Sequence, residues 1–394
     1  MHIGINAQLL SLSETYRAAG VSNYIHYLLR SLSRIDRHNH YTVYTGSWAR
    51  RCDASALIPL GQNFRVCPSH APTHLPLVRL VWEQTIQALR SRHLDVLHGT
   101  VHVVPLVSQM PRVVTLHDLS FLLLPEKHLR SKRNYQTVMA QMSMRRATHV
   151  IADSEYIRQG IIERLRLPPE RVTAVPLAAG EEYRWLGNTT QGQCDIEAFR
   201  QKKGLPERYY LYLGTLEPRK NIPVLLRAYA QLHQEGMGRS TEFLEPPKLV
   251  VAGPKGWLYE EIFAQVKVLG LEKHVLFPGF IPREELVWWY NAALGFVYLS
   301  VHEGFGLPPL QAMSCGVPTI VNNASALPEV IGDAGLCVDA STLPSIVTAL
   351  RDLANSPDLR TDLRLRGLER AAEFSWDRTA RQTLAIYEEA HHGK

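Results

Sequence analysis

The residues best suited to chemistry gather in the segment HEGFGLPPLQAMSCGVPTI, at 302–320. One acid, Glu303, stands before a glycine-rich turn, and Gln311 follows where a second acid would complete a pair of carboxylates. The turn would present backbone N–H groups at the start of a helix, where N–H groups and the helix dipole favour an anion. Its members are Gly304, Phe305, Gly306 and Leu307. The segment therefore predicts an anion site beside a single carboxylate.

Two other places offer related chemistry. Gly20 and Val21 stand at the start of a predicted helix, 21–35, that follows the first predicted strand. The turn EPRKN follows another predicted strand and supplies two neighbouring cations, Arg219 and Lys220. Two helix starts and a cationic turn together predict a cradle for a diphosphate. The first turn lacks a GxGxxG pattern, so dinucleotide binding is only weakly indicated.

Strand and helix patterns alternate around these residues. β-branched or aromatic runs predict strands at 3–7, 41–44, 95–98, 113–116 and 149–152. Amphipathic stretches between them predict helices at 21–35, 77–92, 130–147 and 155–165. The pattern fades after Val175 and restarts with predicted strands at 209–215, 248–254, 274–280, 294–300 and 317–323. Alternation in two blocks predicts an α/β protein with two doubly wound parallel-sheet domains.

The length of the chain agrees with two domains, because 394 residues exceed a typical single core. We place the first domain at 1–180, a linker at 181–206 and the second domain at 207–374. Ligands of parallel sheets bind at the carboxyl ends of the strands. Two such domains facing each other would therefore hold a ligand in the cleft between them.

The composition is that of a soluble globular protein, with 45% apolar and 20% charged residues. No apolar run reaches the roughly 18 residues that span a bilayer, and the N-terminus does not predict a secretory signal. The five cysteines are scattered and form no CxxC pair, which indicates a reducing compartment and argues against structural zinc. We therefore expect a cytoplasmic protein.

Charge is distributed unevenly along the chain. Residues 1–180 hold 21 Lys and Arg against 11 Asp and Glu, a balance of +10, and residues 181–394 hold 22 against 26, a balance of −4. A basic half beside an acidic half suggests an anionic partner for the first domain, such as a lipid surface or a phosphorylated acceptor. The sequence contains no recognisable nucleic-acid module, so we expect no nucleic-acid partner.

The segment 127–147 is the basic amphipathic candidate within this half. Its cations could attract an anionic membrane at the inner face of the plasma membrane. The favoured alternative is a surface helix whose apolar residues face the core. The cations are Lys127, Arg130, Lys132, Arg133, Arg145 and Arg146. The apolar residues are Tyr135, Val138, Met139 and Met142.

These motifs resemble those of the retaining GT-B glycosyltransferases of family 4. The resemblance is carried by YYLYLGTLEPRKNIPVLLRAY, VVAGPKGW, FPGFIPREEL and EGFGLPPLQAMSCGVPTIVNNASALPEVIGDAG in the second domain. It continues more weakly in GVSNYIHYLLRSL, TLHDLSFLLLPEKH and VIADSEYIRQGI. It implies the GT-B fold, two Rossmann-like domains facing across a cleft. It also implies that a final helix, at 375–394, packs back on the first domain.

The resemblance implies roles for individual residues. Glu303 would accept hydrogen bonds from hydroxyls of the donor sugar, since a carboxylate is acceptor-only and charge-assisted bonds are strong. Lys220 and Arg219 would stabilise the diphosphate as it gains charge, and the turn amides would hold its distal phosphate. His117 would line the reacting face of the sugar, with Asp118 as a turn-former or a residue that orients the histidine.

Further contacts to the donor follow from the same resemblance. The glycine loop before the first long helix would lie near the diphosphate, and the GFIP segment would contact the base through its backbone. A structural turn and a donor contact explain Gly253 equally well. The residues concerned are Gly20, Val21, Gly253, Gly279, Phe280 and Ile281.

Two positions depart from the family pattern. Thr215 stands where many members have an arginine, so the cationic share falls to Arg219 and Lys220. Gln311 replaces the second acid, which usually binds both ribose hydroxyls. An amide can bind one hydroxyl but gives up the charge-assisted pairing, a loss of about 1–2 kcal/mol in donor binding. We expect this change to weaken donor binding without abolishing turnover, because the ribose is remote from the reacting bond.

The implied activity is transfer of a hexose from a nucleotide sugar, of the GDP-mannose or UDP-glucose type, to a saccharide or lipid-linked acceptor in polysaccharide assembly. We expect retention of configuration without a metal or another cofactor. Two alternatives remain: a sugar-nucleotide epimerase of the same fold, and a weakened donor-binding subunit, for which Gln311 is the main support. A phosphorylase with pyridoxal phosphate would need a much longer chain.

Overall fold

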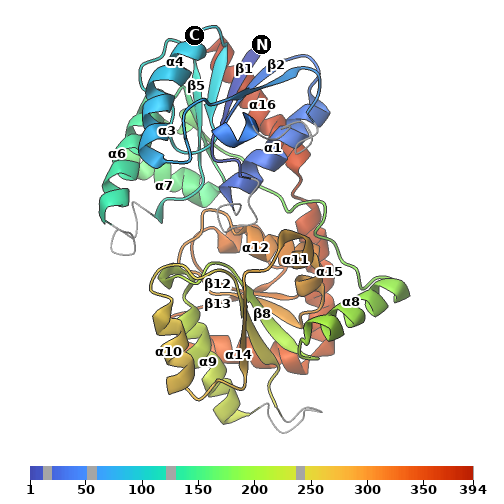
Figure 1. Cartoon of the computed structure of the whole chain (residues 1–394). Coiled ribbons are helices and arrows are strands. Elements are labelled where there is room, and N and C mark those ends of the chain that lie inside the picture. Colours follow the sequence, from blue (N-terminus) through green and yellow to red (C-terminus); the bar gives the residue numbers. More distant parts are fainter. Residues whose placement is uncertain (12–19, 51–59, 121–129, 237–244, 394) are drawn as a thin grey trace. The chain divides into compact units, whose positions relative to one another are not determined.

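The computed structural model describes residues 1–11, 20–50, 60–120, 130–236 and 245–393; for 130–136 it describes the backbone alone. The chain forms two compact units. In Figure 1 the first unit runs from blue to green and includes the red C-terminal helix, and the second runs from green to red. Unit 1 comprises residues 1–177 and 375–394, and unit 2 comprises residues 178–374. The C-terminal segment therefore belongs to the same unit as the N-terminus.

Unit 1 contains a parallel sheet in the order β3-β2-β1-β4-β5-β6-β7. Its central strands are buried along almost their whole length, as expected for a parallel sheet with helices on both faces. The order reverses between β1 and β4, which is where such sheets bind ligands. The strands are β1 (His2–Ala7), β2 (His40–Thr45), β3 (Phe64–Pro68), β4 (Val96–Gly99), β5 (Arg112–Leu116), β6 (His149–Ala152) and β7 (Val172–Ala174).

The C-terminal helix of unit 1 packs against its first helix. The Trp376 ring stacks on Tyr27 at 5.1 Å between centroids, and Arg34 donates to Asp377 at 2.6 Å. The helices are α1 (Val21–Ile35), α3 (Pro76–Trp82), α4 (Ala88–Arg90), α6 (Arg130–Arg146), α7 (Glu155–Leu165) and α16 (Trp376–His392). Short 3₁₀ helices are η2 (Ser47–Arg50) and η5 (Pro169–Arg171), and η3 (Glu83–Gln87) is a π-helix.

Unit 2 contains a second parallel sheet, in the order β10-β9-β8-β11-β12-β13. The strands are β8 (Tyr209–Leu213), β9 (Lys248–Ala252), β10 (Val275–Gly279), β11 (Gly295–Tyr298), β12 (Thr319–Asn322) and β13 (Leu336–Val338). The helices are α8 (Thr190–Lys203), η6 (Pro218–Lys220), α9 (Ile222–Glu235), α10 (Glu260–Val268), α11 (Arg283–Asn291), α12 (Leu307–Ser314), α13 (Leu327–Ile331), α14 (Leu343–Asn355) and α15 (Pro357–Ala372). The order reverses between β8 and β11, so the two segments predicted to do chemistry follow neighbouring strands.

Several short elements differ from the sequence prediction. The runs at β3, β7 and β13 were not predicted as strands, because the last two are only three residues long and each lies at or near a sheet edge. The stretch predicted as a linker contains α8, whose N-cap Thr189 accepts from the Gly192 amide. None of the α8 residues is fully buried, so its sequence carries no apolar period.

The core-facing side of α6 also differs from the prediction. We expected Val138 and Met142 to face the core, and this was wrong because both are exposed. The core contacts come from Ala140, Met144 and Ala147, which pack with the buried residues of β5 and β6. Apolar residues repeat at helical spacing on two sides of α6, and the side with two alanines lies against the sheet. Lys127 falls outside the described residues, as do the side chains of Arg130, Lys132, Arg133 and Tyr135.

Candidate active site

The two predicted cations lie in the connection between β8 and α9. The chain leaves β8 at Leu213 and forms the 3₁₀ turn η6, which contains Arg219 and Lys220. Asn221 then adopts a left-handed conformation, with φ of 59°, and begins α9. Asparagine tolerates this conformation better than most residues, so the sequence EPRKN suits the turn.

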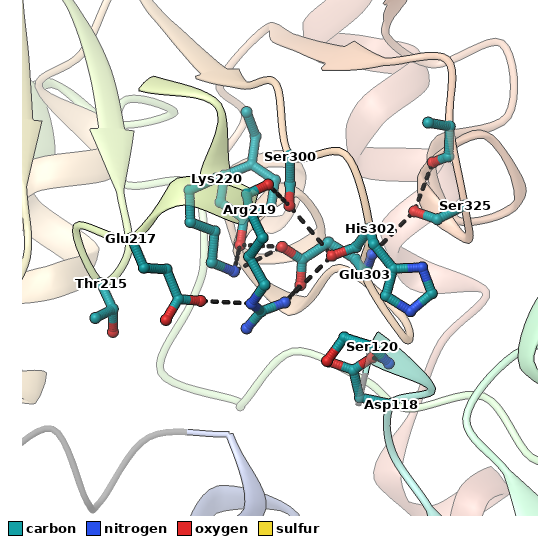
Figure 2. A network of polar contacts seen from close by, with 12 residues as sticks. Asp118, Ser120, Thr215, Glu217, Arg219, Lys220, Ser300, His302, Glu303 and Ser325 are labelled. Carbon is teal, nitrogen blue, oxygen red and sulfur yellow. Dashed lines mark hydrogen bonds and ion pairs between the residues drawn. The ribbon is translucent and has the colours of Figure 1, made fainter. Parts of the chain in front are cut away.

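Glu303 lies in the connection between β11 and α12, at the neighbouring strand end. Its Oε1 atom accepts from Lys220 Nζ at 2.6 Å and from the Tyr298 hydroxyl at 3.0 Å. Lys220 also donates to the Tyr298 hydroxyl, at 2.6 Å. Lys220 and Glu303 are both buried. The structure therefore brings the predicted carboxylate and one predicted cation into a buried ion pair (Figure 2).

Arg219 joins the same network from the adjacent position. Its Nη1 atom donates to the His302 carbonyl at 3.2 Å and lies 3.4 Å from Glu303 Oε2. Its Nε atom donates to Glu217, which holds the guanidinium plane in place (Figure 2). Lys220 and Arg219 thus approach different oxygens of the Glu303 carboxylate, and Glu217 places a second negative charge beside Arg219.

Burial and charge act against each other in this cluster. Burial raises the pKa of Glu303, but Lys220 and Arg219 outweigh it, so that the pKa falls below its usual value and the carboxylate is ionised. Burial lowers the pKa of Lys220, and Arg219 lowers it further, whereas Glu303 opposes both effects. Burial and Glu303 raise the pKa of Tyr298, whose hydroxyl therefore stays protonated and donates. The two cations are balanced by two carboxylates, Glu303 and Glu217, so the cluster carries no net charge.

Hydrogen bonds between side chains and backbone groups hold the loop that carries Glu303 against η6 and the end of β12. The Glu303 amide donates to Ser325 Oγ at 3.0 Å, beyond the end of β12 (Figure 2). Ser300 Oγ donates to the Arg219 carbonyl at 3.1 Å, which ties the β11 loop to η6. Asn322 donates to the Ser300 carbonyl at 3.1 Å. Sequence analysis identified none of these three supporting side chains, nor Tyr298.

The predicted glycine turn leads directly into α12. Gly306 has φ of 108°, and a Cβ atom there would approach Leu327 Cδ2 at 2.9 Å, so glycine is required. Pro308 and Pro309 occupy the first turn of α12 and have no N–H group. Backbone donors at this helix start must therefore come from the turn itself. Its residues are Gly304, Phe305, Gly306 and Leu307.

Gln311 lies within α12, and its side chain is buried. Its Oε1 atom accepts from the Tyr290 hydroxyl of α11 at 3.2 Å. Tyr290 in turn packs edge-on against Tyr183 and Phe296. The Gln311 side chain, which replaces the expected second acid, is therefore bound through its oxygen to the core of unit 2. Its NH₂ group can only donate hydrogen bonds.

The remaining predicted donor contacts of unit 2 lie along the same sheet edge. Gly253 has φ of 138°, and a Cβ atom there would come within 2.0 Å of the Gly214 carbonyl oxygen, so close packing of strand ends explains this glycine. The Gly253 amide donates to the Gly279 carbonyl at 2.8 Å. Phe280 is exposed after β10, whereas Ile281 is buried. Figure 2 shows Thr215 beyond Glu217, away from the Glu303 carboxylate.

The predicted residues of unit 1 gather around the end of β5. His117 Nδ1 lies 2.7 Å from Asp153 Oδ2, and Nε2 lies 2.8 Å from the Thr100 carbonyl oxygen. Both partners are acceptors, so these contacts favour the doubly protonated form of the ring. Burial lowers the pKa of His117, but Asp153 and the Thr100 carbonyl outweigh it, so that the pKa is raised.

The start of α1 lies near this histidine. The Tyr24 ring, one turn into α1, contacts the His117 ring at 4.6 Å between centroids. Gly20, with φ of 49°, caps the helix, and Val21 is its first residue. Asp118 accepts from the Ser120 amide at 2.6 Å and forms a local turn. Asp153, which sequence analysis did not identify, is the residue that orients His117.

Two further features concern metal ligands and the length of the helices. Within the described residues, three or more His, Cys, Asp or Glu side chains nowhere converge in a group that could hold a metal ion. In the same part of the chain, every helix is too short or too polar to cross a membrane.

Comparisons with known proteins agree across the chain. Residues 195–370 match the family glycosyl transferases group 1, and residues 18–179 match glycosyltransferase family 4. O-antigen chain mannosyltransferase B of Escherichia coli is 34% identical over 302 residues, which are 76% of each chain. Serotype-specific mannosyltransferase WbdA of Escherichia coli is 31% identical over 270 residues, 68% of this chain. The aligned part is 32% of WbdA, so the chain spans about a third of that relative.

A solved structure shares the fold over nearly its whole length. Anabaena HepE, in complex with UDP and glucose, superimposes with a TM-score of 0.72 and 17% identity, over 98% of this chain and 99% of that one. An identity this low shows the fold alone. Together with the two parallel sheets, it confirms the predicted GT-B fold class.

Proposed function

Because the chain belongs to the glycosyl transferases group 1 and glycosyltransferase family 4, and is therefore a hexosyltransferase, we propose that it transfers mannose from GDP-mannose to a saccharide acceptor. The names of the two Escherichia coli relatives support mannose as the sugar. O-antigen chain assembly by one relative supports a growing glycan as the acceptor, free or lipid-linked. GDP-mannose would supply both this sugar and a diphosphate for the cations and turn amides of unit 2.

One observation carries the proposal: Glu303, Lys220 and Arg219 form a buried cluster where neighbouring strands end. Two cations, held by the carboxylates of Glu303 and Glu217, lie at a place where parallel sheets bind ligands. A donor diphosphate would interact with both cations. A carboxylate in the same cluster would accept hydrogen bonds from sugar hydroxyls. The cluster thus matches both halves of a nucleotide sugar.

The cations would act mainly on the leaving group. As the bond between the sugar C1 atom and the phosphate oxygen breaks, negative charge grows on the diphosphate. Lys220 is fixed by Tyr298 and Glu303, and Arg219 by Glu217, so neither needs to reorganise during the reaction. Fixed charges of this kind stabilise the transition state more than the ground state.

We propose that the configuration at C1 is retained. The acceptor oxygen would attack C1 on the face from which the phosphate departs. The acceptor hydroxyl proton would pass to the leaving phosphate oxygen, so no separate protein base is required. Arg219, Lys220 and the turn amides would neutralise the leaving group, and we propose that the reaction proceeds without a metal ion.

Nucleotide release tests this function. The chain would be incubated with GDP-mannose, UDP-glucose or UDP-galactose, with and without mannose-containing acceptors, and nucleoside diphosphate would be measured. We expect slow release of GDP from GDP-mannose alone and faster release with acceptor, and an excess of EDTA should change neither rate. Release with none of the donors would favour a donor-binding subunit. Interconversion of the sugar without release would favour an epimerase.

A matched pair of variants assigns the activity to the cluster. Glu303→Gln removes the charge but keeps the shape, and we expect kcat/KM to fall about 10- to 100-fold, the value of one or two charge-assisted hydrogen bonds. Glu284→Gln makes the same change at an exposed position on α11 and should have no effect. Equal activity of both variants would contradict the role of Glu303.

A further inference from the structure

A row of buried polar side chains connects the C-terminal helix of unit 1 to its first helix. Tyr387 Oη of α16 lies 2.6 Å from His98 Nδ1 of β4, and His98 Nε2 lies 2.8 Å from Thr115 Oγ1 of β5. Thr115 Oγ1 in turn lies 3.0 Å from the hydroxyl of Tyr24 on α1. All four side chains are buried, so solvent does not weaken these hydrogen bonds. We call these four residues the polar bridge.

The polar bridge carries no charge. Burial, assisted by the neighbouring His117, lowers the pKa of His98 to about 3. Burial raises the pKa of Tyr24 and of Tyr387, so both hydroxyls keep their protons. A neutral imidazole has one N–H group and one bare nitrogen, so the His98 ring can donate to one hydroxyl and accept from the other. The bridge is therefore a continuous hydrogen-bonded connection between α16 and α1.

One end of the bridge lies beside the site histidine. The Tyr24 ring lies 4.6 Å from the His117 ring at an angle of 69°, the edge-to-face arrangement that aromatic rings favour. Asp153 and the Thr100 carbonyl bind the two ring nitrogens of His117, and the Tyr24 ring adds a third contact. Thr115 lies two residues before His117, the spacing at which side chains of an extended segment point to the same side. The bridge thus supports the ring that packs on His117.

The other end of the bridge lies on the C-terminal helix. This helix, α16, packs against α1, β4 and β5. Its first residue, Trp376, has its ring 6.1 Å from the Tyr24 ring. Tyr24 is therefore held at two points, its hydroxyl by the polar bridge and its ring by Trp376. Loss of the hydroxyl contact would allow the ring to move relative to His117.

We propose that Tyr24 positions the His117 ring for sugar transfer and that the polar bridge holds Tyr24 in place. The proposal rests on the proposed function, since it requires that His117 acts on the reacting sugar. A protonated ring stabilises developing negative charge best at a short and fixed distance, because the interaction weakens as the distance grows. Tyr24 and the rest of the bridge are positioning residues, which act through His117.

NMR of the His117 ring protons tests the geometry without any need for activity. An aromatic ring shifts the resonances of nearby protons, so the His117 signals report where the Tyr24 ring lies. Their absence in His117→Gln identifies them, and Tyr24→Leu gives the signals without the aromatic neighbour. Tyr387→Phe and Thr115→Val each remove one hydroxyl of the bridge. We expect both to move the His117 signals part of the way towards those of Tyr24→Leu.

Two further variants serve as matched controls. Thr115→Ser keeps the hydroxyl and should keep the His117 signals of the unmodified chain. Tyr44→Phe removes another buried tyrosine hydroxyl of unit 1, which donates to the Arg90 carbonyl at 3.3 Å and lies outside the bridge. This variant should lower the stability of the chain but leave the His117 signals and kcat unchanged.

Steady-state nucleotide release in the presence of acceptor measures the effect on the reaction. We expect the kcat of Tyr387→Phe and of Thr115→Val to fall about three- to tenfold, because small displacements near the reacting atoms reduce the rate. The donor KM should stay unchanged, since the diphosphate is assigned to the cations and turn amides of unit 2. Thr115→Ser should retain the kcat of the unmodified chain. A purely structural role would lower stability without separating kcat from KM.

Three results would overturn the proposal. The His117 signals could be the same in Tyr387→Phe as in the unmodified chain, or they could move while kcat stays unchanged. The third is a loss of kcat in Tyr44→Phe as large as that in Tyr387→Phe. Failure of the unmodified chain to release nucleotide from any donor would instead contradict the proposed function, and the His117 signals would still show whether the bridge positions the ring.

Discussion

The buried pair of Lys220 and Glu303 makes a prediction that depends on geometry alone. Lys220→Met keeps an unbranched side chain of similar length but removes the charge. Glu303 then stays buried beside Tyr298 with only Arg219, 3.4 Å from its other oxygen, as a positive neighbour. We expect the free energy of unfolding of unit 2 to fall sharply, because a buried carboxylate has lost its closest partner.

The structure sets the size of this effect. The side chains of Lys220 and Glu303 are 7% and 10% exposed, and removing one partner from a buried pair costs about 3–5 kcal/mol. Arg219 and Tyr298 still stabilise the carboxylate, so we expect the lower end of the range, about 3 kcal/mol. Glu303→Gln in the Lys220→Met background removes the unpaired charge and should restore about 1–3 kcal/mol, a coupling typical of residues in contact.

Hydrogen exchange would measure the loss of unfolding free energy in unit 2 separately from unit 1. The exchange would be followed peptide by peptide across a series of urea concentrations. Amides of β8 and β11 should show the loss in Lys220→Met and the partial recovery in the double variant. Lys267→Met, an exposed lysine on α10, is the matched control and should change nothing. Additive effects of Lys220→Met and Glu303→Gln would refute the reasoning.

The pH dependence follows from the pKa of Glu303. Lys220 and Arg219 hold this pKa below the usual 4.5 in the folded chain, against the effect of burial. A carboxylate with a depressed folded pKa adds stability above its unfolded pKa, and this stability is lost as the pH falls through the folded pKa. The deficit of Lys220→Met should therefore be largest at neutral pH and shrink below about pH 4.5.

Three further predictions concern residues around the site. Gln311→Glu should lower the donor KM with little change in kcat, by the equivalent of about 1–2 kcal/mol, and steady-state kinetics would show it; a collapse of kcat would mean that the amide is required. Tyr290→Phe should lower the free energy of unfolding by about 1 kcal/mol and change the donor KM more than kcat, because Gln311 Oε1 loses its donor. Asp153→Asn should lower the pKa of His117 and shift the acid side of the rate profile, measured together with the ring resonances by NMR; an unchanged His117 titration would contradict the assigned ion pair.

The main residues of the candidate site could be predicted because each lies in a short local motif. Arg219 and Lys220 follow a strand, Glu303 precedes a glycine turn, and both segments follow strands of one parallel sheet. Such sheets place strand ends at one edge, so sequence alone brings the segments close. The sequence did not show that Lys220 and Glu303 would form a buried pair, because that depends on the β8–β11 register.

The supporting residues could not be predicted for the same reason. Tyr298 is the last residue of β11 and reads as one more buried aromatic in an apolar strand. Ser325 reaches Glu303 from the loop after β12, and Asp153 reaches His117 from the end of β6, 36 residues away. In α6 the apolar spacing fitted two sides of the helix, and the packing of Ala140 and Ala147 decided which one is buried.

A crystal structure of the chain with GDP-mannose tests the central claim most directly. The account predicts the diphosphate beside Arg219, Lys220 and the amides of the 304–307 turn, with hydroxyls of the mannose within hydrogen-bond distance of Glu303. A diphosphate bound elsewhere, with Glu303 still paired only to Lys220 and Arg219, would contradict it.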